Sequence, residues 1–275
     1  MPDRLLLAGL EIRAGERVLV RDGGFRVDAG EVVALVGASG SGKTLSARAV
    51  LGLPGPQPGV VAARCSVEAN REVHEPWSGV SEAFATGRLA RFRREVEARF
   101  RAIRGRIVGY LPQDARGALD PLWTVRRQVE EALALGRTPG RATDWLARSG
   151  FRDPASILPL YPHQLSGGMA QRVAIALALA RGSRFLLADE PTSGLDPTVQ
   201  AGILEEIRAT SAEGVGILLI THDLRQVHRV AHRVVFMDTG RVVETLDAAD
   251  MDRARSPEAR ALLASTARIA WRAFA

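Results

Sequence analysis

The order of the structural elements is decided by one stretch, Gly37-Ala38-Ser39-Gly40-Ser41-Gly42-Lys43-Thr44. It follows an apolar run at 32–36 and leads into residues 45–51, which predicts a strand, a glycine-rich loop and a helix in that order. Glycines let the backbone wrap closely around a polyphosphate, so that the N–H groups of the loop and of the helix start point at the anion. The stretch therefore predicts a nucleotide-phosphate site.

Two residues carry the specific chemistry of this loop. The Lys43 ammonium would reach the β- and γ-phosphates, and the Thr44 hydroxyl would ligate Mg²⁺. Lys43 is the only lysine in the chain, which favours a chemical role over a chance turn. A phosphate loop by itself leaves kinases, GTPases and several classes of ATPase open.

Composition sets broad limits on the class of protein. The 275 residues are 46% hydrophobic and 25% charged, as in ordinary globular proteins of one or two domains. The formal net charge of +6 permits nucleotides, nucleic acid or a membrane surface as partners without choosing among them. The single Cys65 excludes an intramolecular disulfide and a cysteine metal cluster, and it fits a reducing compartment.

The hydrophobic runs are short. The longest uncharged apolar run, 173–180, is far below the ~20 residues that span a bilayer, and the run at 5–10 is too short and too early for a secretion signal. If the protein works at a membrane, we expect other chains to provide the span.

Strands and helices alternate along most of the chain. We expect strands at 16–20, 32–36, 107–111, 185–188, 216–220 and 233–237, a turn at 22–24, and helices at 88–106, 122–135, 141–148, 167–181 and 256–275. This alternation predicts an α/β fold with a mostly parallel core sheet, an antiparallel β N-terminal part and a helical subdomain.

The same pattern divides the chain into parts. Residues 1–113 and 184–250 are expected to form the nucleotide-binding core, 114–183 the helical subdomain and 251–275 a packed helical tail. Within the core, about 60–106 reads as an arginine-rich insertion with an amphipathic helix whose charged face is solvated. Docking of that face on a partner or on an anionic surface is the alternative.

Two carboxylates end the apolar run at 185–188. Charge at the end of a buried strand is costly unless a cation or a reaction meets it. Because ligands of parallel sheets lie at the carboxyl ends of the strands, Asp189 is expected near Thr44 and its metal. Asp189 would hold Mg²⁺ and Glu190 would polarise the attacking water.

A second glycine-containing motif, LSGGMAQR at 165–172, begins a helix. Ser166 is a good N-cap, and Gly167 and Gly168 leave the first backbone N–H groups accessible. A cap exposed at a surface can also bind phosphate, so the motif predicts a second anion site.

The order of these motifs resembles the ATP-binding cassette (ABC) ATPases. The resemblance rests on the phosphate loop, Gln113 after a strand, LSGGMAQR, FLLADE at 185–190, SGLD at 193–196 and Thr221-His222-Asp223. It covers nearly the whole chain and implies a P-loop NTPase of ABC type that hydrolyses ATP with Mg²⁺.

The resemblance also implies roles for individual residues. Gln113 would ligate Mg²⁺ and sense the transport partner, Asp196 would cross a dimer interface, and His222 would contact the γ-phosphate. Two cassettes would sandwich two ATP molecules. The implied nucleotide ligands are Gly37, Ser39, Gly40, Ser41, Gly42, Lys43, Thr44, Ser166, Gly167, Gly168 and Asp196; the implied metal ligands are Thr44, Gln113 and Asp189; and the implied catalytic residues are Glu190, His222 and Gln113.

A finer resemblance points to the peptide/nickel group of bacterial importers. It rests on Tyr161-Pro162-His163-Gln164 before the signature, on Gln113-Asp114 followed by Ala118-Leu119-Asp120-Pro121, and on Ser256-Pro257 near the end. The group implies a second, related ATPase subunit, two membrane permeases and a substrate-binding protein, with this chain peripheral on the cytoplasmic face of the plasma membrane.

Three features depart from the family pattern. No aromatic residue precedes Phe25, and Ala14 lies about where the family stacks adenine, so the base is expected either against Arg13 or Arg17 or to be held weakly. The tail lacks cysteines, so no iron–sulfur cluster is expected. The segment 60–106 is longer than usual.

Two other functions stay open. The same fold could serve an exporter or immunity system, or a soluble cassette protein that acts in a multienzyme complex or on nucleic acid. The chain has no coiled-coil insertion and no second cassette, so nucleic acid is not expected as a partner.

Overall fold

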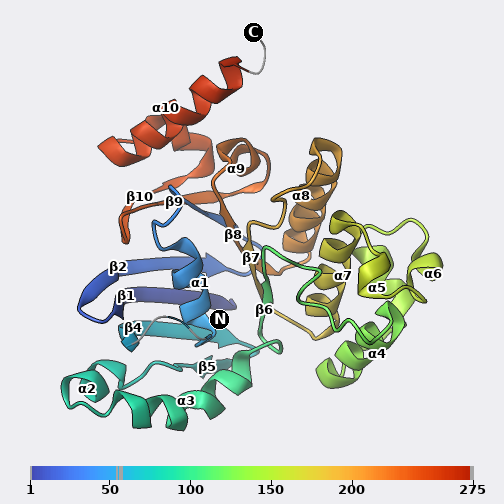
Figure 1. The fold of residues 1–275 in the computed structure, drawn as a ribbon, viewed down its shortest axis with the longest axis horizontal. Coiled ribbons are helices and arrows are strands. Elements are labelled where there is room, and N and C mark those ends of the chain that lie inside the picture. The colour runs from blue at the N-terminus through green and yellow to red at the C-terminus, as the bar shows by residue number, and fades with distance from the viewer. Residues whose placement is uncertain (1, 54, 56–57, 273–275) are drawn as a thin grey trace.

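The computed structural model describes the backbone of residues 2–53, 55 and 58–272, and side chains as far as residue 265, apart from that of Pro58. Ile269, Trp271 and Phe274, which the sequence places in the tail, lie outside the described side chains. Figure 1 shows two sheets at the centre, with a group of helices to one side of them.

The larger sheet has six strands in the order β10-β9-β3-β8-β7-β6. They are β3 (Val32–Val36), β6 (Val108–Leu111), β7 (Phe185–Asp189), β8 (Gly216–Thr221), β9 (Arg233–Asp238) and β10 (Arg241–Asp247). All neighbours pair in parallel except β10, which runs antiparallel to β9. The predicted mostly parallel core sheet is confirmed, and it brings the carboxyl ends of β3, β7 and β8 to one edge.

The smaller sheet is antiparallel, with the order β2-β1-β4-β5. Its strands are β1 (Arg4–Ala14), β2 (Arg17–Asp28), β4 (Pro58–Ala69) and β5 (Glu72–His74). The turn expected at 22–24 is wrong, because β2 runs through these residues. Asp22 has φ 53°, and the β1–β2 register shifts around Leu10, so the polar and glycine residues form an irregularity inside a long strand.

The segment 58–106 joins this sheet to the core. β4 pairs along β1, and the segment continues with α2 (Val80–Ala85) and α3 (Leu89–Ile103). The predicted amphipathic helix is confirmed, since Leu89, Val96, Phe100 and Ile103 are buried. Its apolar face packs into the same cluster as helix α1 (Lys43–Val50).

The helical part follows β6. It contains α4 (Val125–Gly136), α5 (Ala142–Arg148), α6 (Pro154–Ile157), the 3₁₀ turn η1 (Pro162–Gln164) and α7 (Gly167–Ala180), with α8 (Pro197–Ala212) after β7. The helix expected from residue 122 begins three residues later, because Thr124 caps it by accepting a hydrogen bond from the Arg127 backbone N–H.

The chain ends with α9 (Leu224–Val230), the 3₁₀ turn η2 (Ala248–Arg253) and α10 (Pro257–Arg272). Leu262 and Leu263 pack against the cluster that includes Val36 and Phe236, so the described part of the tail is packed on the core.

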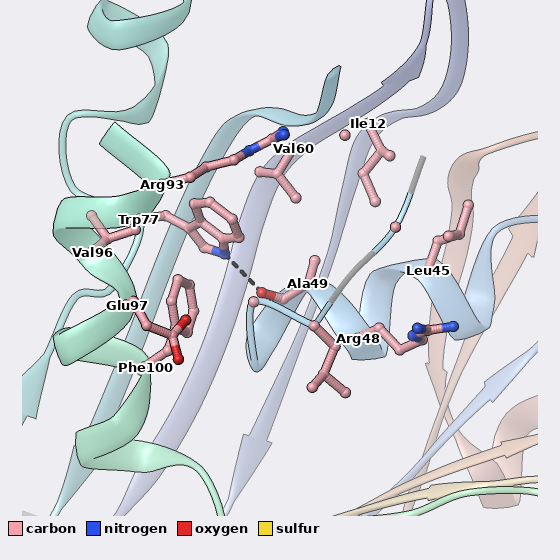
Figure 2. A pocket seen from close by; sticks show the side chains of 14 residues that line it. Ile12, Leu45, Arg48, Ala49, Val60, Trp77, Arg93, Val96, Glu97 and Phe100 are labelled. Carbon is pink, nitrogen blue, oxygen red and sulfur yellow. Dashed lines mark hydrogen bonds between the residues drawn. The ribbon is translucent and has the colours of Figure 1, made fainter. Parts of the chain in front are cut away.

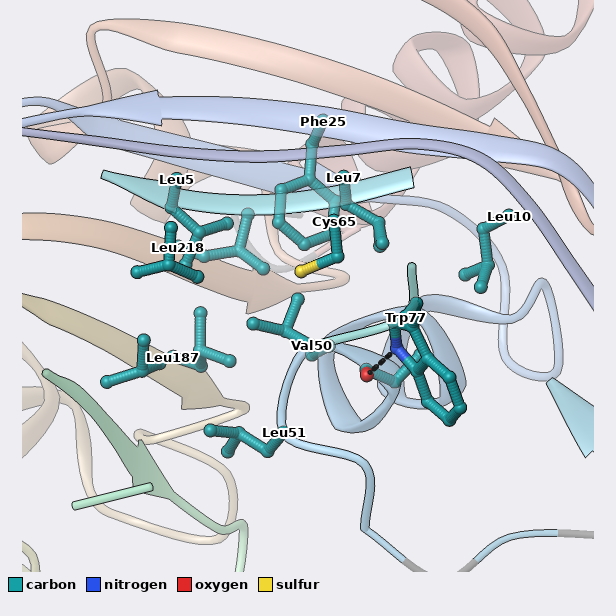
Figure 3. Packing of buried hydrophobic residues seen from close by; sticks show 14 of the residues in the cluster. Leu5, Leu7, Leu10, Phe25, Val50, Leu51, Cys65, Trp77, Leu187 and Leu218 are labelled. Atoms are coloured by element: carbon teal, nitrogen blue, oxygen red, sulfur yellow. Dashed lines mark hydrogen bonds between the residues drawn. The ribbon is translucent and has the colours of Figure 1, made fainter. Parts of the chain in front are cut away.

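Alternation along each strand divides the core between the two faces of the central sheet. Val33 and Leu35 face α1 and the antiparallel sheet, whereas Leu186 and Ala188 face the helical part. Figure 3 shows residues of the first cluster, including Leu7 and Leu218 from the two sheets, with Val50 of α1 among them. Both sides of the sheet are therefore covered.

Candidate nucleotide site

The phosphate loop joins β3 to α1 and depends on its glycines. A Cβ on Gly37 would clash with the Met237 carbonyl oxygen. Gly42 has φ +101°, and a Cβ there would lie 2.9 Å from a Val20 methyl group. The neighbouring strands thus press against the loop, and larger residues at these two positions would displace its backbone N–H groups.

Lys43 lies across the inside of the loop. Its Nζ donates hydrogen bonds to the carbonyl oxygens of Gly37 at 2.9 Å and of Ala38 at 2.8 Å, and the residue is 6% exposed. Burial lowers the pKa of the Lys43 ammonium, while the carboxylates of Glu190 and Asp189 act in the opposite direction. The cation is therefore held within the loop and near the two acids.

Thr44, in the first turn of α1, contacts Asp189, at the end of β7, as the sequence predicts. Thr44 Oγ1 donates to Asp189 Oδ1 at 3.0 Å, and Asp189 is buried at the end of β7. Asp189 has a second donor that no sequence motif indicates: Tyr110 Oη, from β6, donates to Asp189 Oδ2 at 2.9 Å. Burial raises the pKa of the Tyr110 phenol, with Asp189 adding to the rise, so the phenol stays a neutral donor.

Glu190 and His222 lie at the ends of β7 and β8. His222 Nδ1 is 3.0 Å from Glu190 Oε1, and the Glu190 backbone N–H donates to the Ile220 carbonyl at 3.0 Å. Glu190 has φ 47°, a left-handed conformation that non-glycine residues seldom adopt. Strain of this kind persists only where the surroundings enforce it, and it is frequent at functional sites.

Gln113 lies on the exposed segment after β6. Its Nε2 donates to Ser193 Oγ at 3.3 Å, which places it beside the segment that follows Glu190. The structure therefore gathers the phosphate loop, Asp189, Glu190 and His222 at one edge of the sheet, with Gln113 on an adjoining loop.

The signature residues lie elsewhere. Ser166 caps α7 and accepts a hydrogen bond from the Met169 N–H at 3.2 Å, and Asp196 caps α8 by accepting from Thr198 and Val199. Within the described residues, no hydrogen bond joins either cap to the phosphate loop. Figure 1 shows α7 and α1 on opposite sides of β6 and β7. Ser166 and Asp196 are both exposed, so they are available to another molecule.

A second residue that the sequence analysis missed is Gln226. Its Oε1 accepts from Thr192 Oγ1 at 3.1 Å and from Thr221 Oγ1 at 3.2 Å, and all three side chains are buried. This network fixes the segment after Glu190 relative to the segment before His222. Gln226 lies among the apolar residues of the short segment 224–230, and a buried polar side chain needs hydrogen-bond partners, so its position in the sequence was the available signal.

The expected base position is at the end of β1. Ala14 is half-buried, Arg17 is exposed, and Arg13 bonds Glu11 while its guanidinium lies 5.4 Å from the Phe84 ring centroid. Placement of adenine against Arg13 or Arg17 stays a prediction.

A cavity of about 280 Å³ is lined by residues of α1 and of the segment 58–106. Figure 2 shows Trp77 and Phe100 on one wall and Arg48 on another, with the Trp77 indole N–H donating to the Ala49 carbonyl at 2.7 Å. This bond attaches the segment 58–106 to the helix that carries Lys43 and Thr44.

The donor set near Thr44 suits Mg²⁺. A hydroxyl, a carboxylate and an amide supply hard oxygen ligands, and Mg²⁺ is ordinarily held by one or two carboxylates together with substrate phosphates. In the part of the chain that is described, no group of three or more His, Cys, Asp or Glu residues could hold a metal by itself.

Residues 20–193 match the family model described as ABC transporter. The chain belongs to the ABC transporter family. It is 40% identical to the dipeptide transport ATP-binding protein DppD of Escherichia coli, over 87% of this chain and 69% of the relative. It is 38% identical to the nickel import ATP-binding protein NikD of Brucella suis, over 94% and 92% of the two chains. These relatives confirm two predictions: that the chain is an ABC ATPase, and that it belongs to the peptide/nickel importer group.

Solved ABC structures share the fold. A structure described as the ATP binding subunit of an ABC transporter superposes with a TM-score of 0.66 at 25% identity, covering 96% of this chain and 99% of the other. A post-hydrolysis dimer of the cassette MJ0796 with ADP and Pi gives 0.67 at 23% identity, over 89% and 98%. The ABC fold predicted from the motifs is confirmed. None of the described helices is long and apolar enough to cross a membrane.

Proposed function

We propose that this chain is the ATP-hydrolysing subunit of a bacterial ABC importer for peptides, nickel or a metal chelate. The observation that carries the proposal is the similarity over nearly full length to import ATP-binding proteins, together with the joined pairs Thr44–Asp189 and Glu190–His222 beside the phosphate loop. The import direction is supported by the relative NikD, which is described as a nickel import ATP-binding protein.

The chain's own groups supply the steps of hydrolysis. Lys43 would exchange its two carbonyl partners for phosphate oxygens, a stronger charge-assisted interaction. Thr44, Asp189 and Gln113 would hold Mg²⁺, which supplies neutralisation of the phosphate charge when it is bound. Glu190 would orient and polarise the attacking water, and His222 would hold Glu190 and contact the γ-phosphate.

The other half of the site would come from a second cassette. The exposed Ser166, with Gly167 and Gly168, would cover the nucleotide held by a partner's phosphate loop, and Asp196 would lie at the interface. ATP would then stabilise the pair, and hydrolysis would release it. The pair is either two copies of this chain or this chain with a related subunit.

Two permeases and a substrate-binding protein complete the proposed assembly, which places this chain on the cytoplasmic face of the plasma membrane. Within the chain we propose a core of 1–113 and 184–250, a helical subdomain of 114–183 and a tail of 251–275. The apolar cluster that contains Val125, Leu146 and Val173 lies on one face of the central sheet and supports a helical subdomain that packs against the core.

Purification of the tagged chain from solubilised membranes tests the proposal. We expect two hydrophobic permease chains and a second cassette to co-purify, and the cargo-loaded binding protein to stimulate ATP hydrolysis. Recovery with nucleic acid, or hydrolysis stimulated by a substrate on the cytoplasmic side alone, would contradict it.

A further inference from the structure

Tyr110 is a polar side chain in a strand that is otherwise apolar. It pairs in register with Leu187 of β7, two residues before Asp189, and it packs partly against the core cluster that contains α1. A phenylalanine would fill the same space. The hydroxyl therefore needs an explanation besides packing.

The hydroxyl binds one oxygen of Asp189 while Thr44 binds the other. The two distances are 2.9 Å to Oδ2 and 3.0 Å to Oδ1. Asp189 is 5% exposed, so water has little access to replace either donor. With both oxygens held from different elements, the plane of the carboxylate is fixed.

We propose that Tyr110 is a positioning residue that orients Asp189 for Mg²⁺. The inference rests on the proposed function, because it takes Asp189 as a metal ligand. Tyr110 holds Oδ2, which leaves Oδ1 directed toward Thr44, so the phenol would act on the metal only through Asp189. Partners that orient a metal ligand in this way are typically worth ten- to hundredfold in metal affinity.

The position of Tyr110 has a further consequence. It lies near the end of β6, three residues before Gln113, whose side chain bonds Ser193. The phenol therefore attaches the Gln113 loop to the metal-binding carboxylate.

Substitution Tyr110→Phe in the full chain removes the hydroxyl alone. Two quantities are measured: the affinity for an ATP analogue in EDTA, by calorimetry, and the affinity for Mn²⁺ with that analogue, by electron paramagnetic resonance. We expect an analogue affinity within twofold of the wild type and a ten- to hundredfold loss in Mn²⁺ affinity. The matched control is Tyr161→Phe, whose ring stacks on His163, away from Asp189, and whose affinities should not change.

A double-substitution cycle separates positioning from a general structural role. In an Asp189→Asn background, Tyr110→Phe should have no further effect on Mn²⁺ affinity. Unchanged Mn²⁺ affinity in Tyr110→Phe, equal loss of both affinities, or the same loss in the Asp189→Asn background would overturn the inference. Failure of the proposed function would show differently, as a wild-type chain that binds neither the analogue nor Mn²⁺.

Discussion

Gly168 of α7 packs directly against Val199 of α8, and a Cβ at Gly168 would clash with a Val199 methyl group. Both residues lie in the first turn of their helices, whose caps are Ser166 and Asp196. The close packing of Gly168 against Val199 therefore fixes the position of Ser166 relative to Asp196. The glycine that the motif requires has a packing role in addition to any contact with phosphate.

Substitution Gly168→Ala should destabilise the protein by about 1–3 kcal/mol through this overlap. Chemical denaturation measures the change. Adding Val199→Ala makes room for the new methyl group and should recover part of the loss. If the double variant is no more stable than Gly168→Ala, the contact does not limit the packing of the two helices.

Lys43→Ala should lower ATP affinity by at least about tenfold, because the ammonium that lies across the loop is removed. Calorimetry with the full chain measures the affinity, and an unchanged melting temperature controls for folding. Unchanged ATP binding would contradict the assignment of the loop.

Ser166→Ala should separate the two halves of the proposed site. Nucleotide affinity at the chain's own phosphate loop should stay unchanged, whereas turnover in the assembled pair should fall, because the serine would act on the partner's nucleotide. Loss of the helix cap should also cost about 1 kcal/mol of stability. Equal loss of binding and turnover would contradict the division of roles.

Glu206 of α8 predicts a pH dependence of stability. Its Oε1 lies 2.7 Å from Nε of Arg172 in α7, yet the effect of burial outweighs that attraction and raises the pKa of the Glu206 carboxyl to about 7. A pKa raised on folding gives stability that is complete below the unfolded value of about 4.5 and is lost as pH rises through 7. The stability of Glu206→Gln relative to the wild type should therefore increase between pH 5 and 8, by about 1–3 kcal/mol.

Denaturation curves at several pH values measure this difference. A difference that does not vary with pH, or one that decreases as pH rises, would show that Glu206 stays ionised in the folded protein.

The sequence predicts those parts of the fold that depend on local pattern. The buried strands read as short apolar runs, and the rule that ligands gather at the carboxyl ends of parallel strands predicts that Asp189 lies near Thr44. Ser166 was likewise recognisable as a cap from its position before an apolar helix.

Other features depend on contacts between distant segments. The residues Asp22 to Gly24 read as a turn, but pairing of β2 with β1 carries the strand through them. The residues of β4 and β5 show no clear strand pattern in charge or hydrophobic spacing. Their strands form because β4 pairs with the distant strand β1 and with β5. Tyr110 looked like an ordinary strand residue, because its partner is 79 positions away.

Glu190→Gln gives the most direct test of the central claim, that ATP joins two cassettes and hydrolysis separates them. The amide keeps the size of the side chain but cannot polarise water as the carboxylate does. Light scattering of this variant, with ATP and with its usual partner subunit, should show a stable pair. Its rate of hydrolysis should fall to a small fraction of the wild-type rate. A variant that binds ATP and stays monomeric under these conditions would contradict the account.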